Sequence, residues 1–153
     1  MDIESTLLVL GESDVKAQGG VTQGQTLKAL IGSGKYPTDR LRVALANYEP
    51  NTMEQLHWHP IEACYFVVSG SAIVRDINNK EYHAGPGTII YCPPGIAGAH
   101  EWEVKDKMQL LSIRASTESN KKLQFTVDKA TKRSYIDLAD LVKRDAISFS
   151  SHY

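Results

Sequence analysis

Cysteine is scarce in this sequence, and long apolar runs are absent. The chain of 153 residues has two cysteines, Cys64 and Cys92, which do not form a CxxC pair. Each lies inside an apolar, strand-like run, so we expect two buried thiols and no disulfide framework. No stretch reaches the roughly 18 apolar residues of a membrane-spanning helix, and no basic segment leads into an apolar N-terminal run. These absences predict a cytoplasmic protein.

An excess of charge of either sign is also lacking. The chain has 17 Lys and Arg residues against 18 Asp and Glu residues, with a net charge of -1. No basic stripe with interleaved aromatic residues appears, so neither nucleic acid nor an anionic membrane surface is an expected partner. The expected partner is a small organic molecule.

Short strand-like runs separated by turn residues are what the sequence has in quantity. Breaks such as Ser69-Gly70 and Pro93-Pro94-Gly95 supply the backbone conformations and missing donors that end strands. Many short strands at this spacing predict an all-β sandwich or barrel. The runs cover residues 27–31, 41–48, 52–59, 64–68, 72–77, 88–92, 100–104 and 108–113.

A chain of this length fits a single domain, 1–153, with its own hydrophobic core. We expect an N-terminal strand and flexible arm over 1–25, a barrel over 26–116 and an extension over 117–153. The apolar run Leu7 to Leu10 is either the first strand of this barrel or a strand added to a neighbouring subunit. One helix is expected near 135–145, where Ser134 would cap and Asp137 would complete a capping box. This helix should pack on the outside of the barrel.

The most informative motif is His57-Trp58-His59-Pro60. Side chains alternate along a strand, so both imidazoles point to the same side. A third histidine, His100, follows the glycine- and proline-rich region 84–95, where the chain could return to the same place. Neutral imidazole is a common ligand of Zn, Fe, Ni and Cu. The three histidines are therefore predicted to hold one metal ion.

These motifs resemble the two halves of the cupin signature and cover residues 51–100. The resemblance implies a double-stranded β-helix, or jelly-roll barrel, with one divalent transition metal held inside by histidines of two strands. Iron is the metal we expect first, with Mn, Ni, Zn and Cu as alternatives. Small cupins are commonly dimers, so a homodimer is also implied. The residues that carry the resemblance are Asn51, His57, His59, Gly70, Gly87, Pro93, Pro94, Gly95 and His100.

The sequence departs from the cupin pattern at the carboxylate ligand. The family spacing, with six residues before Gly70, puts that position at Ala63, whereas the nearest carboxylate is Glu62. Neighbours on a strand face opposite sides. Either a one-residue shift in the turn from His59 to Glu62 brings Glu62 inward as a metal ligand and acid-base group, with a β-bulge restoring the register before Gly70, or the site has three histidines and no carboxylate. In the second case Tyr65 points inward with Ala63 and is the candidate to hold substrate or move a proton.

Two further departures are milder. Asn51 stands where the family usually has glycine, and asparagine also tolerates the left-handed backbone conformation. His100 arrives two residues later than the family spacing Pro-x-Gly-x-x-His, and the small residues of the loop 95–99 can form a wider turn.

Strand alternation suggests which other side chains line the pocket. Met53 and Gln55 share the parity of His57, and Trp102 shares the parity of His100. Tyr91, on the strand that leads to Pro93, is a further pocket candidate whose direction the sequence leaves open.

Three functions are compatible with an open metal site in a dry barrel. The first is an oxidative, dioxygenase-like enzyme, which the missing carboxylate favours slightly because it leaves room for a bidentate substrate. The second is a metal-assisted isomerase, cyclase or lyase. The third is a barrel that binds a small ligand without catalysis. A fold does not choose among these functions.

Overall fold

Ten strands form within residues 2–32, 35–115 and 123–143, which are the residues that this computed structural model describes. The strands are β1 (Gln18–Gly19), β2 (Gln25–Ile31), β3 (Arg42–Tyr48), β4 (Met53–Trp58), β5 (Ala63–Asp76), β6 (Glu81–Ala84), β7 (Ile89–Cys92), β8 (His100–Arg114), β9 (Phe125–Val127) and β10 (Ser134–Tyr135). Two short 3-10 helices, η1 (Glu12–Asp14) and η2 (Ile96–Gly98), and one α-helix, α1 (Leu138–Lys143), complete the described elements.

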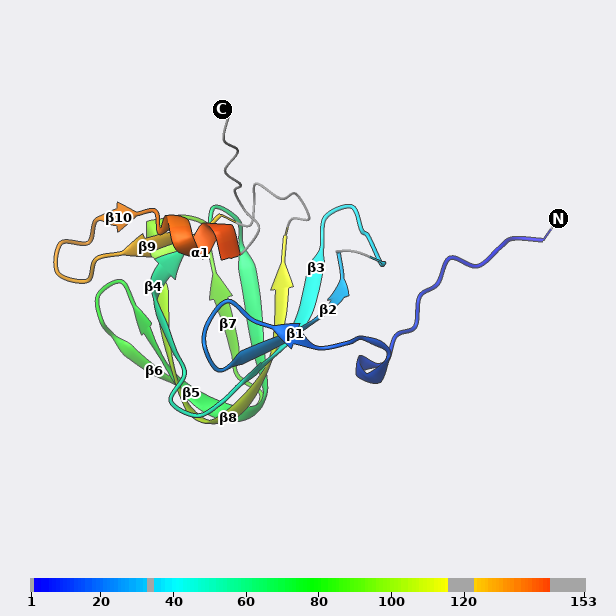
Figure 1. Cartoon of the computed structure of the whole chain (residues 1–153), viewed down its shortest axis with the longest axis horizontal. Helices are drawn as coiled ribbons and strands as arrows, with labels where there is room; N and C mark the ends of the chain where they lie inside the picture. Colours follow the sequence, from blue (N-terminus) through cyan, green and yellow to red (C-terminus); the bar gives the residue numbers. More distant parts are fainter. Residues whose placement is uncertain (1, 33–34, 116–122, 144–153) are drawn as a thin grey trace, which may run out of the picture.

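The long strands β5 and β8 connect the two sides of the barrel. They pair with each other from Ala63 opposite Arg114 to Asp76 opposite His100. The first part of β8 also pairs with β4 and the last part with β3. Similarly, the first part of β5 pairs with β7 and the second part with β6. Figure 1 shows both strands curving around the bottom of a barrel, so the predicted all-β jelly roll with a short C-terminal helix is confirmed.

The predicted break at Ser69-Gly70 is a bend within one strand. The backbone of Gly70 is left-handed, with φ of 79°, and a Cβ added there would lie 2.1 Å from the carbonyl oxygen of Lys107. The β5–β8 register shifts on both sides of this point. The predicted runs 64–68 and 72–77 are therefore one strand, β5, and the runs 100–104 and 108–113 are one strand, β8. In both cases β-bulges let the pairing continue where a turn was expected.

The C-terminal helix begins three residues later than predicted. Ser134 and Tyr135 form β10, which pairs with β9, and the Asp137 side chain caps the helix by accepting the Asp140 N–H at 3.0 Å. The Ser134 hydroxyl instead accepts a hydrogen bond from the indole of Trp58 at 2.8 Å. Pairing with β9 thus overrides the predicted capping box. The end of the predicted helix, residues 144–145, lies outside the described residues.

The N-terminal run Leu7 to Leu10 belongs to no strand of this barrel. Leu7 and Val9 are 82% and 84% exposed, and Figure 1 shows this segment extending away from the barrel. A first strand on the chain's own barrel is therefore the wrong alternative, and addition to a neighbouring subunit stays a prediction. The barrel begins earlier than residue 26, because β1 pairs with β2.

The core lies between the two sides of the barrel. Its largest cluster joins aromatic and aliphatic side chains of β3, β5 and β8, including Tyr48, Val67 and Met108. Both cysteines are free thiols: Cys92 is buried, which raises its pKa to about 12, whereas Cys64 is only half-buried. Among the described residues, no helix has the length and apolar character needed to cross a membrane.

Candidate metal centre

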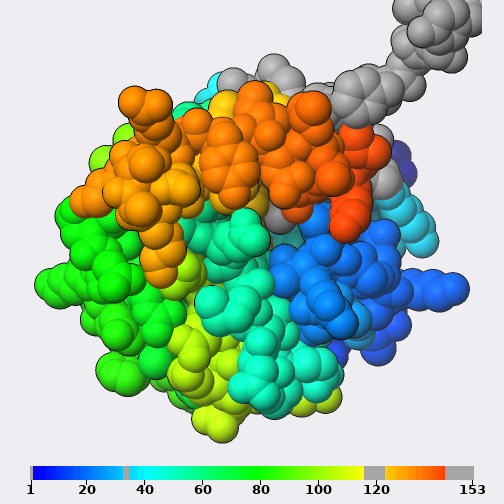
Figure 2. All heavy atoms as spheres, turned by 60° about the vertical axis from the view of Figure 1, so that its left-hand side comes forward, coloured from blue at the N-terminus to red at the C-terminus, as the bar shows by residue number. Residues whose placement is uncertain are grey.

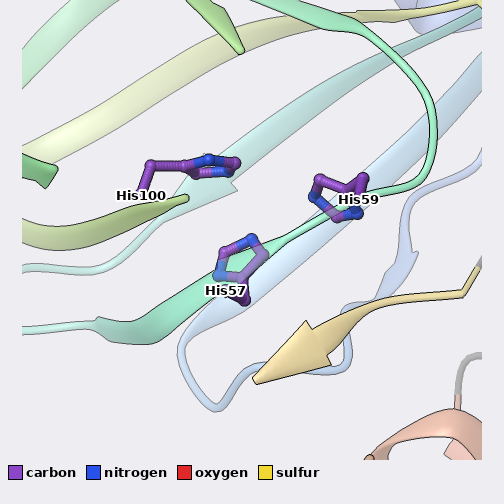
Figure 3. A group of neighbouring side chains, drawn as sticks. All are labelled: His57, His59 and His100. Carbon is purple, nitrogen blue, oxygen red and sulfur yellow. The ribbon is translucent and has the colours of Figure 1, made fainter. Parts of the chain in front are cut away.

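The three predicted histidines converge inside the barrel. Their ligand nitrogens all lie within 4.8 Å of one another, and each side chain is at most 4% exposed. His57 on β4 is the direct cross-strand partner of His100 at the start of β8, and His59 follows the end of β4. Figure 3 shows the three rings pointing toward one another. The three imidazoles could therefore hold a transition-metal ion.

Backbone carbonyls fix the orientation of two of these rings. Nδ1 of His57 donates to the carbonyl oxygen of Gln55 at 2.6 Å, and Nδ1 of His100 donates to that of Gly98 at 2.9 Å. Such hydrogen bonds select the tautomer whose Nε2 carries the lone pair, as is typical of metal-ligating histidine. Nε2 of His100 is buried and has no hydrogen-bond partner in the described part of the chain. An ion bound there would satisfy it.

His100 is held in its neutral form. Burial, followed by the proximity of His57, lowers its pKa from 6.5 to about 3. Because a metal binds neutral imidazole, His100 can coordinate an ion at neutral pH without first losing a proton.

The longer loop before His100 still delivers this histidine to the site. Residues 96–98 form η2, and the N–H of Gly95 donates to the carbonyl of His59 at 3.0 Å, which ties the loop to the first motif. A Cβ at Gly98 would lie 2.1 Å from the carbonyl oxygen of Pro93, so the turn needs glycine. Asn51 is left-handed, with φ of 66°, as its replacement of glycine predicts.

Of the two alternatives at the carboxylate position, the structure adopts three histidines without Glu62. Ala63 is 2% exposed and faces the interior, whereas Glu62 is exposed and accepts a hydrogen bond from the Tyr91 hydroxyl at 2.8 Å. Glu62 is therefore not placed to ligate the metal or to act on a substrate. Tyr91 is 56% exposed and lies outside the cavity, because its parity on β7 turns it outward.

Tyr65 lies beside the histidines, as the Ala63 register predicts. It is 5% exposed, and its ring centroid lies 5.8 Å from that of His100 and 5.7 Å from that of Trp102. Trp102 is 3% exposed and forms part of the cavity wall. The predicted positions of Tyr65 and Trp102 therefore agree with the structure.

Met53 and Gln55 do not line the cavity, because β4 contains a bulge. Met53 pairs with Glu103 and Glu54 with Trp102, but the register has slipped by one residue when His57 pairs with His100. One extra residue reverses the parity, so Glu54 shares the interior face with His57. Met53 and Gln55 are exposed instead.

A cavity of about 480 Å³ lies between the two sides of the barrel, next to the histidines. Glu54 lines it, and its carboxylate accepts hydrogen bonds from the hydroxyls of Tyr48 at 3.3 Å and Thr22 at 3.4 Å. Burial and then the nearby Glu54 raise the pKa of Tyr48 well above its usual value. Figure 2 shows the C-terminal segment lying across the upper edge of the barrel. The cavity-lining residues that the sequence did not indicate include Gln25, Arg42, Tyr48, Glu54, Ser112, Arg114, Gln124 and Lys143.

Known proteins share this architecture. A family model described as a cupin domain matches residues 44–114, and no curated protein matches the chain. One similar solved structure is the polyketide cyclase RemF of Streptomyces resistomycificus, at 22% identity and a TM-score of 0.63, covering 74% of this chain and 81% of that one. A sugar phosphate isomerase from a cupin superfamily of Silicibacter pomeroyi has 18% identity and a TM-score of 0.61, with 80% and 88% coverage.

A third similar structure is the oxalate decarboxylase of Lactobacillus farciminis, with 18% identity and a TM-score of 0.58. The match covers 76% of this chain but 36% of the decarboxylase. At such identities the three proteins show a common fold, and they differ from one another in the reaction that each is named for.

Proposed function

Because residues 44–114 are a cupin domain, we propose that this protein is a metal-dependent enzyme that acts on a small organic substrate. The observation that carries this proposal is the convergence of His57, His59 and His100 beside a cavity of about 480 Å³. A cavity of this size is within the range of small-molecule sites.

His57, His59 and His100 would hold the ion, and iron remains the metal we expect first. When bound, a divalent transition metal supplies a Lewis acid that polarises a substrate oxygen. The barrel walls exclude water from the same place, since the three histidines and Tyr65 are each at most 5% exposed. Charges and dipoles act more strongly in such a site than in water.

Two side chains of the cavity region are our candidates to hold or move a proton. Tyr65 faces His100 from β5, and its hydroxyl can donate or receive one. Glu54 lines the cavity from β4, one cross-strand pair away from His57, and its carboxylate can accept one. This pair of proton carriers favours a metal-assisted isomerase, cyclase or lyase.

The oxidative reaction class is the second candidate. It is supported by the absence of Glu62 from the histidine cluster, since three neutral ligands leave more room for a bidentate substrate. A panel of β-dicarbonyls and aromatic diols, offered to the iron-loaded protein with and without dioxygen, separates the two classes. Turnover under strict anaerobiosis, supported by Zn or Ni as well as by Fe, favours proton transfer, and turnover with stoichiometric dioxygen consumption favours oxidation.

Metal content tests the proposal itself. We expect the purified or reconstituted protein to bind one ion per chain, as measured by elemental analysis. His57→Ala should lose most of this metal, whereas His83→Ala should keep it, because His83 is an exposed residue of β6. A wild-type protein that cannot take up metal, or a His57→Ala variant with unchanged metal content, would contradict the proposal.

A further inference from the structure

Two arginines face the cavity from neighbouring strands. Arg42 on β3 is the direct cross-strand partner of Arg114 on β8, and Arg114 is in turn opposite Ala63 on β5. Both arginines line the cavity, and both are half-buried. Since directly opposed side chains lie on the same face of a sheet, the two guanidinium groups extend from one row of the interior wall.

Such a pair is unfavourable for the sheet alone. Like charges directly opposite each other destabilise an antiparallel pair. Among the described residues, the ion pairs that include an arginine belong to Arg75, and Nη1 of Arg42 is buried without a hydrogen-bond partner. Burial and the nearby Arg114 lower the pKa of Arg42, in agreement with the missing counter-charge. An anionic ligand would supply it.

The net charge of the cavity-lining residues also favours an anionic ligand. Of the described lining residues, three are cationic, namely Arg42, Arg114 and Lys143, and one is anionic, Glu54. The chain as a whole carries a net charge of -1, so the cavity concentrates positive charge that the rest of the molecule lacks. A cleft of one charge sign attracts ligands of the opposite sign.

The arginine row is next to the proposed reaction site. Moving two residues along each strand leads from the arginine row to the row of Ala44, Ser112 and Tyr65, a step of about 7 Å. Tyr65 contacts His100 from there, so the cavity joins the arginines to the histidines. The small side chains of Ala44 and Ala63 leave room beside the guanidinium groups.

We propose that Arg42 and Arg114 bind an oxyanionic group, carboxylate or phosphoryl, of a small organic substrate. The planar guanidinium fork matches the geometry of both groups. The apolar and aromatic walls, which include Leu27, Tyr48 and Trp102, contact the carbon skeleton, while its other end lies at Tyr65 and the histidines. Placement of the reacting end rests on the proposed metal function, whereas binding of the oxyanion does not.

Isothermal titration calorimetry on the full chain tests this assignment. The probes are benzoate, phenyl phosphate and the neutral benzamide, each titrated into the metal-loaded and the chelator-treated protein. Arg42→Gln and Arg114→Gln remove one charge each, and Arg133→Gln is the matched control because Arg133 is exposed. Arg42→Lys keeps the charge without the fork. Circular dichroism checks that each variant folds, and elemental analysis measures its metal content.

We expect the wild type to bind at least one of the two anions more tightly than benzamide, with or without metal. Either Gln variant should weaken that binding about tenfold or more, since hydrogen bonds to charged groups are strong. Arg42→Lys should lie between Arg42→Gln and the wild type, and Arg133→Gln should match the wild type. The anion that binds more tightly shows whether the anionic group of the substrate is a carboxylate or a phosphoryl group.

Three results would overturn the assignment: no preference for the anions over benzamide, no binding of either anion, or equal anion affinity in the wild type and the Gln variants. Metal content should be unchanged in every arginine variant. If Arg42→Gln loses anion binding but keeps its full metal content, the anion site is distinct from the metal site. If the wild type binds the anion but holds no metal, the metal proposal fails and the anion site stands.

Discussion

Acid should destabilise the metal-free protein through His100. Burial and the nearby His57 lower the pKa of this side chain from 6.5 to about 3 in the folded protein. In the unfolded chain the imidazole has its ordinary pKa, so between these two values only the unfolded state takes up the proton. The contribution of His100 to the free energy of unfolding is therefore complete above pH 6.5, and it is lost as the pH falls toward the folded-state pKa of about 3.

The size of the effect follows from the same two values. Each pH unit below the ordinary pKa corresponds to about 1.4 kcal/mol while the folded imidazole stays neutral. Between about pH 7.5 and about pH 4.5, His100 alone should therefore lower the free energy of unfolding by roughly 3 kcal/mol. For a domain whose total stability is about 5 to 15 kcal/mol, this is a large fraction.

Urea unfolding of chelator-treated protein, followed by tryptophan fluorescence at both pH values, measures the loss. His100→Gln removes the titrating group but keeps a polar side chain, and His83→Gln is the control because His83 is exposed. The wild type and His83→Gln should each lose roughly 3 kcal/mol more on acidification than His100→Gln. Comparing the pH dependence of each variant cancels any constant change in its stability. An equal loss in the wild type and His100→Gln would refute the reasoning.

Two further predictions concern the barrel and its assembly. Gly70→Ala should lower the free energy of unfolding by roughly 2 to 4 kcal/mol, because its Cβ would meet the backbone of Lys107 at a left-handed position. Gly85→Ala, whose Cβ would meet nothing within 4 Å, is the control, and equal losses in thermal or urea unfolding would contradict the strain argument. The homodimer remains a prediction that sedimentation equilibrium can check. The full chain should sediment as a dimer, and a chain that begins at Gly11 should dissociate more readily if the exposed run Leu7 to Leu10 pairs with the neighbouring subunit.

The histidine cluster could be predicted from sequence because it depends on local rules. His57 and His59 are two residues apart, and side chains two residues apart on an extended chain point to the same side. This relation does not depend on which strand the segment pairs with. The glycine and proline residues before His100 indicate where the chain can turn back toward His57. The resemblance to cupins gives the order of the two motifs that carry the histidines. The structure adds that His57 and His100 are direct cross-strand partners.

The number and length of the strands were less predictable. The bend at Gly70 has the composition of a turn, yet β5 runs through it because β8 continues to pair on both sides. Similarly, β9 and β10 have three and two residues, and their strand conformation depends on contacts with β4 and with each other, including the stacking of Trp58 on Phe125, whose ring centroids lie 4.2 Å apart. Tertiary pairing of this kind has no signal in the periodicity of the segment itself.

The bulge in β4 has the largest consequence for function. The cupin spacing directs attention to a carboxylate on β5, and the interior position there is Ala63. One extra residue in β4 brings Glu54 into the cavity instead, where its charge raises the pKa of His100 and so opposes the effect of burial. A carboxylate is thus present in the cavity that His57 also lines, but outside the histidine cluster. Because a group in that position is available to accept a proton, Glu54 supports the proton-transfer chemistry that we propose over the oxidative reaction, which the missing carboxylate on β5 slightly favoured.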